Sequence, residues 1–222
     1  MLKEIGEDGQ RRLAASSALI VGLGGLGAPV ATYLTGAGVG RIGLCDADVV
    51  SESNLQRQTL YSEAPLGMPK AEAAHQRLSS MSSHTRFDLH PCGLTTENAI
   101  ALVSDYDIVL DCTDNYAARY IIDDACWQAG KPWVHGAIGE FNGMVTVFNH
   151  QGGKRYTDLY PDREAMLAIP HTVSGVLGAT PGVVGALQAS EALKALAGFG
   201  ILLDGRLLII NLLDASFSTV EY

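Results

Sequence analysis

Three glycines near the start of the chain have the spacing of a nucleotide-binding turn. Gly22, Gly24 and Gly27 form the pattern G-x-G-x-x-G, which follows an apolar run and precedes helix-forming residues. Such glycines let backbone N–H groups and the first turn of a helix come close to phosphate. Asp46 stands where an acidic residue usually accepts the ribose hydroxyls. The pattern predicts a nucleotide site; the alternative is a glycine turn needed only for packing.

A polar stretch over residues 51–70 carries groups that suit a triphosphate. These polar and basic side chains belong to Ser53, Asn54, Arg57, Gln58 and Lys70. Arg and Lys neutralise the negative charge that develops while a phosphate bond breaks. An NAD site needs no such groups here, so the stretch favours ATP. For isolated basic residues such as Arg57 and Lys70, a solvated surface position is the alternative.

Two predicted strands end in acidic residues. The strand expected over residues 41–48 ends in Asp46 and Asp48, and the strand over 107–115 ends in DCTDN, with Asp111, Asp114 and Asn115. Carboxylates beside phosphates are normally tolerated only with a cation such as Mg²⁺ between them. We therefore expect Asp114 to hold Mg²⁺. Capping of the next helix by Thr113, Asp114 or Asn115 is the alternative.

Alternating strands and helices must position these groups. Strands are expected over residues 18–24, 41–48, 85–94 and 107–115, and helices over 28–39, 71–82, 96–105 and 116–130. With right-handed crossovers, this order predicts a Rossmann-like α/β fold: a mainly parallel central sheet with helices on both faces. Ligands then bind beyond the carboxyl ends of the strands, where the glycine turn and both acidic runs fall.

The second half of the chain predicts a partly antiparallel C-terminal extension. A strand pair is expected over residues 132–150, a helix within 174–198, and one or two strands over 206–222. Residues 154–173 lack a clear period and predict a mobile loop. No linker or repeat divides the chain, so we expect a single domain over residues 1–222.

Composition limits the classes of partner and compartment. The net charge of −9 argues against nucleic acid. No apolar run is long enough for a membrane span, and the charged N-terminus lacks a signal peptide, so we expect a cytoplasmic protein. The cysteines form no C-x-x-C pair and are expected to be buried apolar side chains: Cys45, Cys92, Cys112 and Cys126.

Five motifs occur in one order along the chain: LIVGLGGLG, D-x-D-x-V-x-x-SNLQRQ, G-x-PK, DCTDN and G-x-x-Q-A-x-E-A-x-K. Together they resemble the ThiF/MoeB/HesA family, bacterial relatives of ubiquitin-activating enzymes, over nearly the whole chain. The resemblance implies an ATP-dependent adenylyltransferase that activates the C-terminal carboxylate of a small ubiquitin-like sulfur carrier. It also implies Mg²⁺, a carrier ending in Gly-Gly, a homodimer, and a place in thiamine or molybdopterin biosynthesis.

The resemblance also assigns roles to residues. The catalytic residues would be Arg57, Lys70 and Asp114, the last as the Mg²⁺ ligand. The nucleotide-binding residues would be Gly22, Gly24, Gly25, Gly27, Asp46, Asp48, Ser53, Asn54, Gln58 and Asn115. A carboxylate oxygen would attack the α-phosphate in line, helped by positioning and charge neutralisation.

The chain also departs from the family at three places. Arg155 and Asp158 stand where members commonly have the first of two zinc-binding C-x-x-C pairs, so no zinc is expected. His171 stands at the position of a sulfur-handling cysteine, so no covalent intermediate is expected. The family's N-terminal R-Y-x-R-Q segment, whose arginine reaches the neighbouring subunit's ATP, would precede Met1.

Three other functions stay open. The first is a degenerate nucleotide- or partner-binding protein without turnover, which the missing arginine segment favours. The second is activation of a small-molecule or RNA group on the same fold. The third, an NAD-dependent oxidoreductase, is disfavoured by SNLQRQ and Lys70.

Overall fold

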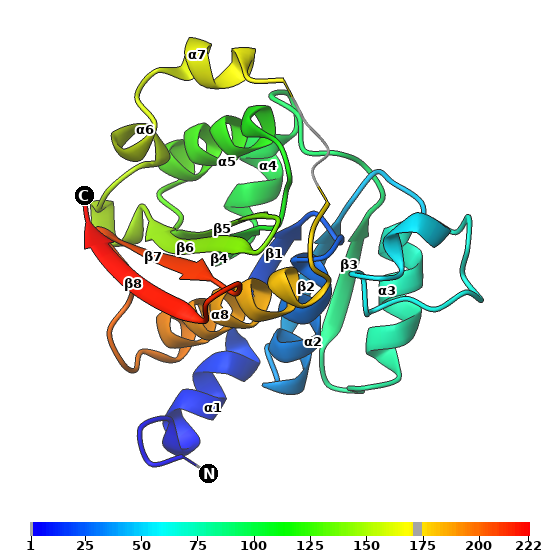
Figure 1. Cartoon of the computed structure of the whole chain (residues 1–222). Coiled ribbons are helices and arrows are strands. Elements are labelled where there is room, and N and C mark those ends of the chain that lie inside the picture. Colours follow the sequence, from blue (N-terminus) through cyan, green and yellow to red (C-terminus); the bar gives the residue numbers. More distant parts are fainter. Residues whose placement is uncertain (1, 171–174) are drawn as a thin grey trace.

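An eight-stranded sheet runs through the molecule in the order β3-β2-β1-β4-β5-β6-β7-β8 (Figure 1). The computed structural model describes residues 2–170 and 175–222. The strands are β1 (Ser17–Val21), β2 (Arg41–Cys45), β3 (Arg86–His90), β4 (Ile108–Asp111), β5 (Trp133–Gly139), β6 (Asn142–Phe148), β7 (Arg206–Asn211) and β8 (Ser216–Glu221). Neighbours from β3 to β5 pair in parallel, and those from β5 to β8 pair antiparallel. The predicted Rossmann-like class and its antiparallel extension are confirmed.

Helices cover both faces of the sheet. One face carries α1 (Gly6–Ala15), α2 (Gly27–Gly36), α3 (Lys70–Ser79) and α8 (Ala179–Ala197). The other carries α4 (Ala99–Ser104), α5 (Tyr116–Ala129) and α6 (Tyr156–Leu159), and α7 (Arg163–Ala168) packs on α5. Two short 3₁₀ turns, η1 (Glu52–Asn54) and η2 (His150–Gly152), lie in connections.

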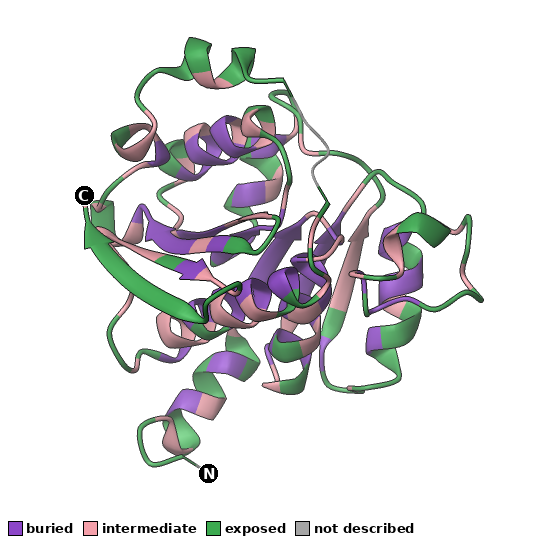
Figure 2. Cartoon of the chain, in the orientation of Figure 1, coloured by how far each residue is buried: buried purple, intermediate pink, exposed green. Residues whose placement is uncertain are grey.

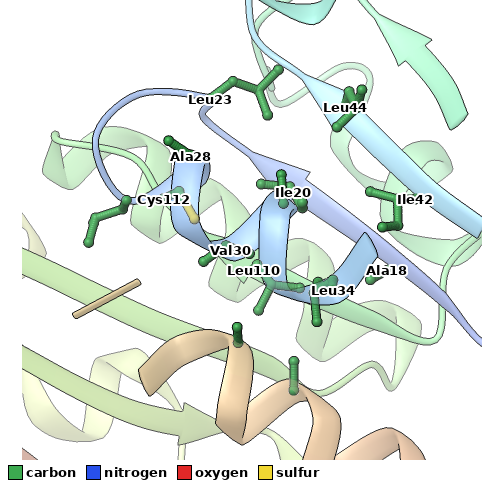
Figure 3. Packing of buried hydrophobic residues seen from close by; sticks show 14 of the residues in the cluster. Ala18, Ile20, Leu23, Ala28, Val30, Leu34, Ile42, Leu44, Leu110 and Cys112 are labelled. Carbon is green, nitrogen blue, oxygen red and sulfur yellow. The ribbon is translucent and has the colours of Figure 1, made fainter. Parts of the chain in front are cut away.

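The alternation of side chains along β1 divides the core into two clusters. Ala18 and Ile20 join the cluster under α2 and α8, whereas Leu19 and Val21 join the cluster under α4 and α5. Figure 3 shows side chains of α2 and of the sheet meeting in the first cluster. A strand covered on both faces must be apolar throughout, which explains its sequence. In contrast, β8 is exposed along its whole length at the sheet edge (Figure 2).

Several expectations about the elements were wrong. The strands predicted over residues 18–24, 85–94 and 107–115 end earlier, at Val21, His90 and Asp111. The strand predicted over residues 41–48 ends at Cys45, because the Asp46 carboxylate accepts hydrogen bonds from the N–H groups of Leu23 and Asp48 and turns the chain. Much of the loop predicted over residues 154–173 is helical, as α6 and α7. Helices this short present too few turns for a period to be visible in the sequence.

The cysteine prediction was wrong at one of its four positions. Cys45, Cys112 and Cys126 are buried, but Cys92 is exposed. It lies just beyond β3, outside the strand pairing. No helix in the described part of the chain is long and apolar enough to cross a membrane.

Candidate nucleotide site

The glycine turn joins β1 to α2 at the carboxyl edge of the sheet. Gly22 has a φ of +93°, and a Cβ there would lie 2.6 Å from the carbonyl oxygen of Cys112. A Cβ on Gly27 would lie 2.1 Å from the carbonyl oxygen of Gly22. Packing therefore requires both glycines, and it places the β4–α5 turn directly against the glycine turn. Gly24 and Gly25 instead border the 51–70 segment and the start of α8.

Asp46 is held at the end of β2. Its Oδ2 accepts a hydrogen bond of 2.7 Å from the Leu23 N–H, and its Oδ1 accepts one of 2.8 Å from the Asp48 N–H. The first bond ties the carboxylate to the glycine turn. Asp46 therefore lies where the sequence predicts the ribose acid, beside the backbone that would hold the phosphates.

Lys70 is buried at the first position of α3. Its surface is 4% exposed, so the alternative of a solvated lysine is wrong. Nζ lies 2.9 Å from Asp48 Oδ2 and 3.8 Å from Asp46 Oδ2. A buried ammonium needs anionic partners, and these two carboxylates supply them. The Asp48 side chain is 75% exposed, so this ion pair borders the molecular surface.

Arg57 and Asn54 form a second group beside the glycine turn. Arg57 Nη2 donates a 2.8 Å hydrogen bond to Asn54 Oδ1, and Nη1 donates a 3.4 Å bond to the carbonyl oxygen of Ser53. Arg57 Cγ lies 3.6 Å from the position that a Cβ would take on Gly25. The Ser53 hydroxyl lies 2.9 Å from that of Ser51. The structure thus brings Arg57 of the run SNLQRQ against the glycine turn.

Gln58 contributes an unsatisfied acceptor to this group. Its side chain is buried, and its Oε1 has no hydrogen-bond partner in the described part of the chain. Its Nε2 lies 3.4 Å from the position of a Cβ on Gly24. Buried polar atoms are normally paired. An acceptor of this kind beside a glycine turn fits a bound polar ligand.

Sequence reasoning missed Tyr61. Its buried Oη donates a 2.9 Å hydrogen bond to the carbonyl oxygen of Leu23 and lies 3.4 Å from that of Lys70. Burial raises the pKa of Tyr61 above its ordinary value, so the hydroxyl remains a donor. Tyr61 therefore links the glycine turn to the start of α3. The one visible signal is an aromatic residue within a polar segment.

The DCTDN run forms the turn between β4 and α5. Asn115 Oδ1 accepts a 2.9 Å hydrogen bond from the Ala118 N–H. Of the three possible caps in the sequence, Thr113, Asp114 and Asn115, it is therefore Asn115 that caps α5. Asp114 and Asn115 line a pocket of about 300 Å³ together with residues of α7 and the segment after it, namely Met166, Leu167, Ile169 and Pro170. Asp111 is fully buried and is not one of the residues that line this pocket.

Comparison with known proteins agrees with these motifs. A sequence model of the ThiF family matches residues 1–222. The chain belongs to the ThiF family. It is 44% identical over 223 residues to a sulfur carrier protein adenylyltransferase of Thermus thermophilus, covering 98% of this chain and 82% of that protein.

Longer ThiF-family relatives also match the chain. Adenylyltransferase and sulfurtransferase MOCS3 of Mus musculus is 44% identical over 226 residues, covering 100% of this chain and 48% of the relative. The chain spans about half the length of the MOCS3 proteins it matches. A crystal structure of E. coli MccB is similar in fold, with a TM-score of 0.85 and 20% identity over 96% of this chain and 64% of that one.

The family's usual zinc position is occupied by an ion-pair cluster. Arg155 Nη2 lies 2.8 Å from Asp123 Oδ2 and 3.0 Å from Asp124 Oδ1, and the Arg155 N–H donates a 2.7 Å bond to Asp158 Oδ2. Among residues 2–170 and 175–222, no group of three or more His, Cys, Asp or Glu side chains could hold a metal ion. That the protein carries no zinc stays a prediction.

The thiols nearest the site are poor nucleophiles. Burial raises the pKa of Cys45 to about 12 and that of Cys112 well above its ordinary value. The thiolate is the reactive form of cysteine, so both are inert at neutral pH. His171, at the family's cysteine position, lies outside the described residues.

Proposed function

We propose that this ThiF-family chain is an ATP-dependent adenylyltransferase that activates the C-terminal carboxylate of a small ubiquitin-like sulfur-carrier protein. The observation that carries the proposal is the convergence of Lys70 and Arg57, from one crossover, on the glycine turn beside Asp46. The name of the Thermus relative, a sulfur carrier protein adenylyltransferase, supports the same reaction and substrate.

The residues at this edge of the sheet fit ATP with Mg²⁺. Asp46 would accept the ribose hydroxyls, and the backbone N–H groups at the start of α2 would receive the phosphates. Asp114 offers the oxygen donor that Mg²⁺ prefers. When bound, the cation would neutralise phosphate charge. Gln58 Oε1, buried without a partner in the described residues, would accept from the nucleotide.

The chain's own residues position the reactants and neutralise charge. An oxygen of the carrier's carboxylate forms a bond to the α-phosphorus. The bond from the α-phosphorus to the oxygen that bridges it to the β-phosphorus breaks, and pyrophosphate leaves with the electron pair of that bond. Lys70 and Arg57 would hold the charge that develops on the phosphates. In such reactions, alignment and electrostatics supply most of the rate. No general base is needed, because the attacking carboxylate is already ionised.

The carrier's Gly-Gly end and a homodimeric assembly form part of this proposal. The family resemblance supports both. The turn that carries Asp114 lies against the glycine turn through Gly22 and Cys112, so we expect a tail that enters at the pocket beside Asp114 to reach the phosphates. A side chain larger than glycine at the end of that tail would have less room to pass.

The test is ATP–pyrophosphate exchange with a purified carrier ending in Gly-Gly. We expect exchange that depends on the carrier and on Mg²⁺, and none with a carrier lacking its last glycine. Titration calorimetry should show binding of ATP·Mg²⁺ and weaker or no binding of NAD. ATP binding without exchange would favour a binding protein without turnover. Tighter binding of NAD would contradict the proposal.

A further inference from the structure

The turn that carries Asp114 and Asn115 is held by a buried carboxylate that the proposed reaction does not touch. Asp111, the last residue of β4, is fully buried. Its Oδ1 accepts hydrogen bonds from the N–H (3.0 Å) and the hydroxyl (2.6 Å) of Thr113, and its Oδ2 accepts one of 2.7 Å from His135 Nδ1. Asp111 therefore fixes the position of Thr113, the residue directly before Asp114 in the turn.

Arg119, on α5, forms a hydrogen bond with the same residue. Its Nη2 donates a 3.3 Å hydrogen bond to the carbonyl oxygen of Thr113, and its Nε lies 3.7 Å from Asp111 Oδ2. The guanidinium also lies over the ring of Tyr116, 5.3 Å from its centre. Thr113 is thus held at its N–H, hydroxyl and carbonyl groups by one buried ion pair.

The burial of Arg119 and its position near the start of α5 are both energetically unfavourable for a cation, unless it holds the turn at Thr113. It is 8% exposed and stands one turn after the start of α5. A cation near the N-terminus of a helix opposes the helix dipole, and a buried guanidinium is costly without an anion. Within the described part of the chain, the Asp111 carboxylate and the Thr113 carbonyl oxygen are the groups that compensate its charge at this turn.

We propose that Arg119, paired with Asp111, is a positioning residue for adenylation that fixes the turn bearing Asp114 and Asn115. The inference rests on the proposed function. Asp114 and Asn115 directly follow the residue that the pair holds, so a shift of Thr113 moves both. Misplacement of a reacting group by about 1 Å can lower a rate by about a hundredfold.

A second ion pair on α5 serves as the matched control. Arg155 reaches the buried carboxylate of Asp123 with an Nη2–Oδ2 distance of 2.8 Å, but it fastens α6, and its ion-pair partners are Asp123 and Asp124 rather than Asp111. If Arg119 only stabilised the fold, Arg119→Lys and Arg155→Lys would have the same consequences. If it positions the turn, only Arg119→Lys changes the site.

The experiment compares both variants by exchange kinetics over a range of Mg²⁺ concentrations. For Arg119→Lys we expect a melting temperature close to that of Arg155→Lys, an exchange rate lowered by about tenfold or more, and a higher Mg²⁺ concentration for half-maximal rate. Thr113→Val removes one bond to Asp111 without changing charge, and it should shift the Mg²⁺ requirement in the same direction. Wild-type Mg²⁺ dependence in both Arg119→Lys and Thr113→Val would overturn the proposal.

Hydrogen–deuterium exchange separates this inference from the proposed function. In Arg119→Lys, or in Thr113→Val if the first variant does not fold, we expect faster exchange over residues 112–118 and unchanged exchange over 22–27. Arg155→Lys should leave residues 112–118 unchanged. If the wild type catalyses no pyrophosphate exchange, the proposed function fails, but this readout still decides whether Arg119 positions the turn. Unchanged protection of 112–118 would show that it does not.

Discussion

Lys70 lies with its ammonium group between two carboxylates, buried at the start of α3. For Lys70→Met we expect the pyrophosphate-exchange rate to fall by at least about tenfold, because removing a charged contact to the transition state typically costs about 2–4 kcal/mol. The measurement is the exchange rate at saturating ATP, with the melting temperature recorded in parallel.

Arg77 on the exposed face of α3 provides the control for this substitution. Arg77→Met removes a cation from the same helix without touching Asp46 or Asp48, so its exchange rate should equal that of the wild type. A Lys70→Met protein that exchanged at the wild-type rate would mean that the lysine serves only to neutralise the two carboxylates.

One of the four cysteines should react with an alkylating reagent in the folded protein, and the other three should not. Cys92 is exposed, whereas Cys45, Cys112 and Cys126 are buried. Iodoacetamide should therefore alkylate Cys92 alone in the native protein and all four cysteines after unfolding, as counted by intact-protein mass spectrometry. After incubation with ATP and carrier, we expect no adduct that a reductant removes. A stable conjugate on any cysteine would contradict the expectation of a non-covalent reaction.

The sequence predicted the site residues more completely than the contacts between them. Motif spacing singled out Lys70, Arg57 and Asp46 as candidates, because the chemistry of a nucleoside triphosphate needs those residue types. It could not identify Tyr61, since its hydroxyl joins Leu23 to Lys70 and this contact exists only after the chain folds. Nor could it show that Asp111 is a structural carboxylate, because Asp111 and Asp114 look equivalent in DCTDN.

At the scale of elements, the contact between β4 and β5 makes stability depend on pH. Burial lowers the pKa of His135 below its ordinary value of 6.5, despite the neighbouring Asp111. Burial opposes ionisation of Asp111 too, but hydrogen bonds from His135 and Thr113 and the Arg119 charge keep its pKa below the ordinary 3.8. Both groups therefore bind a proton more readily in the unfolded chain than in the folded one.

We expect the free energy of unfolding to decrease as the pH falls below 6.5. In that range the unfolded chain gains a proton on His135 before the folded protein does, and the slope for this group is at most about 1.4 kcal/mol per pH unit. A further loss follows below 3.8 from Asp111. Burial also lowers the pKa of His90, so His135→Asn should reduce the first decrease in urea titrations without abolishing it, and His84→Asn, on the exposed surface, should leave it unchanged.

The ion pairs that fasten α6 and α7 to α5 should differ in strength. Asp123 is 1% exposed and Arg155 is its guanidinium partner, so Arg155→Ala leaves a buried carboxylate unpaired and should cost about 3–5 kcal/mol. Arg163 and Asp124 have side chains 45% and 39% exposed, and Arg163→Ala should cost at most about 1 kcal/mol. Urea unfolding of the two variants checks the difference; equal losses would contradict it.

These short helices also mark a limit of sequence reasoning. α6 and α7 are held by Arg155 and Arg163, whose partners Asp123 and Asp124 lie far earlier along the chain, and not by an apolar period of their own. Long elements were predicted well because their patterns are local. The end of α5 at Gly130, which has a φ of +64°, is one such local signal.

Removal of metal ions should abolish the activity of the protein without changing its stability. The family's first zinc position holds Arg155 and Asp158 here, both engaged in hydrogen bonds. We expect chelation by EDTA to abolish pyrophosphate exchange through loss of Mg²⁺ while leaving the melting temperature unchanged, and elemental analysis to find no stoichiometric zinc. A lowered melting temperature, restored by zinc, would contradict this.

The position of α8 has a consequence for synthesis on the ribosome. This helix packs on β4, β5 and β6 and on α2, and its start touches the glycine turn, yet it is complete only at Ala197. Until that residue has left the exit tunnel, the nascent sheet keeps an uncovered apolar face. Chains arrested shorter than this should bind chaperones and be cleaved readily by protease, whereas those extended past β8 should resist it.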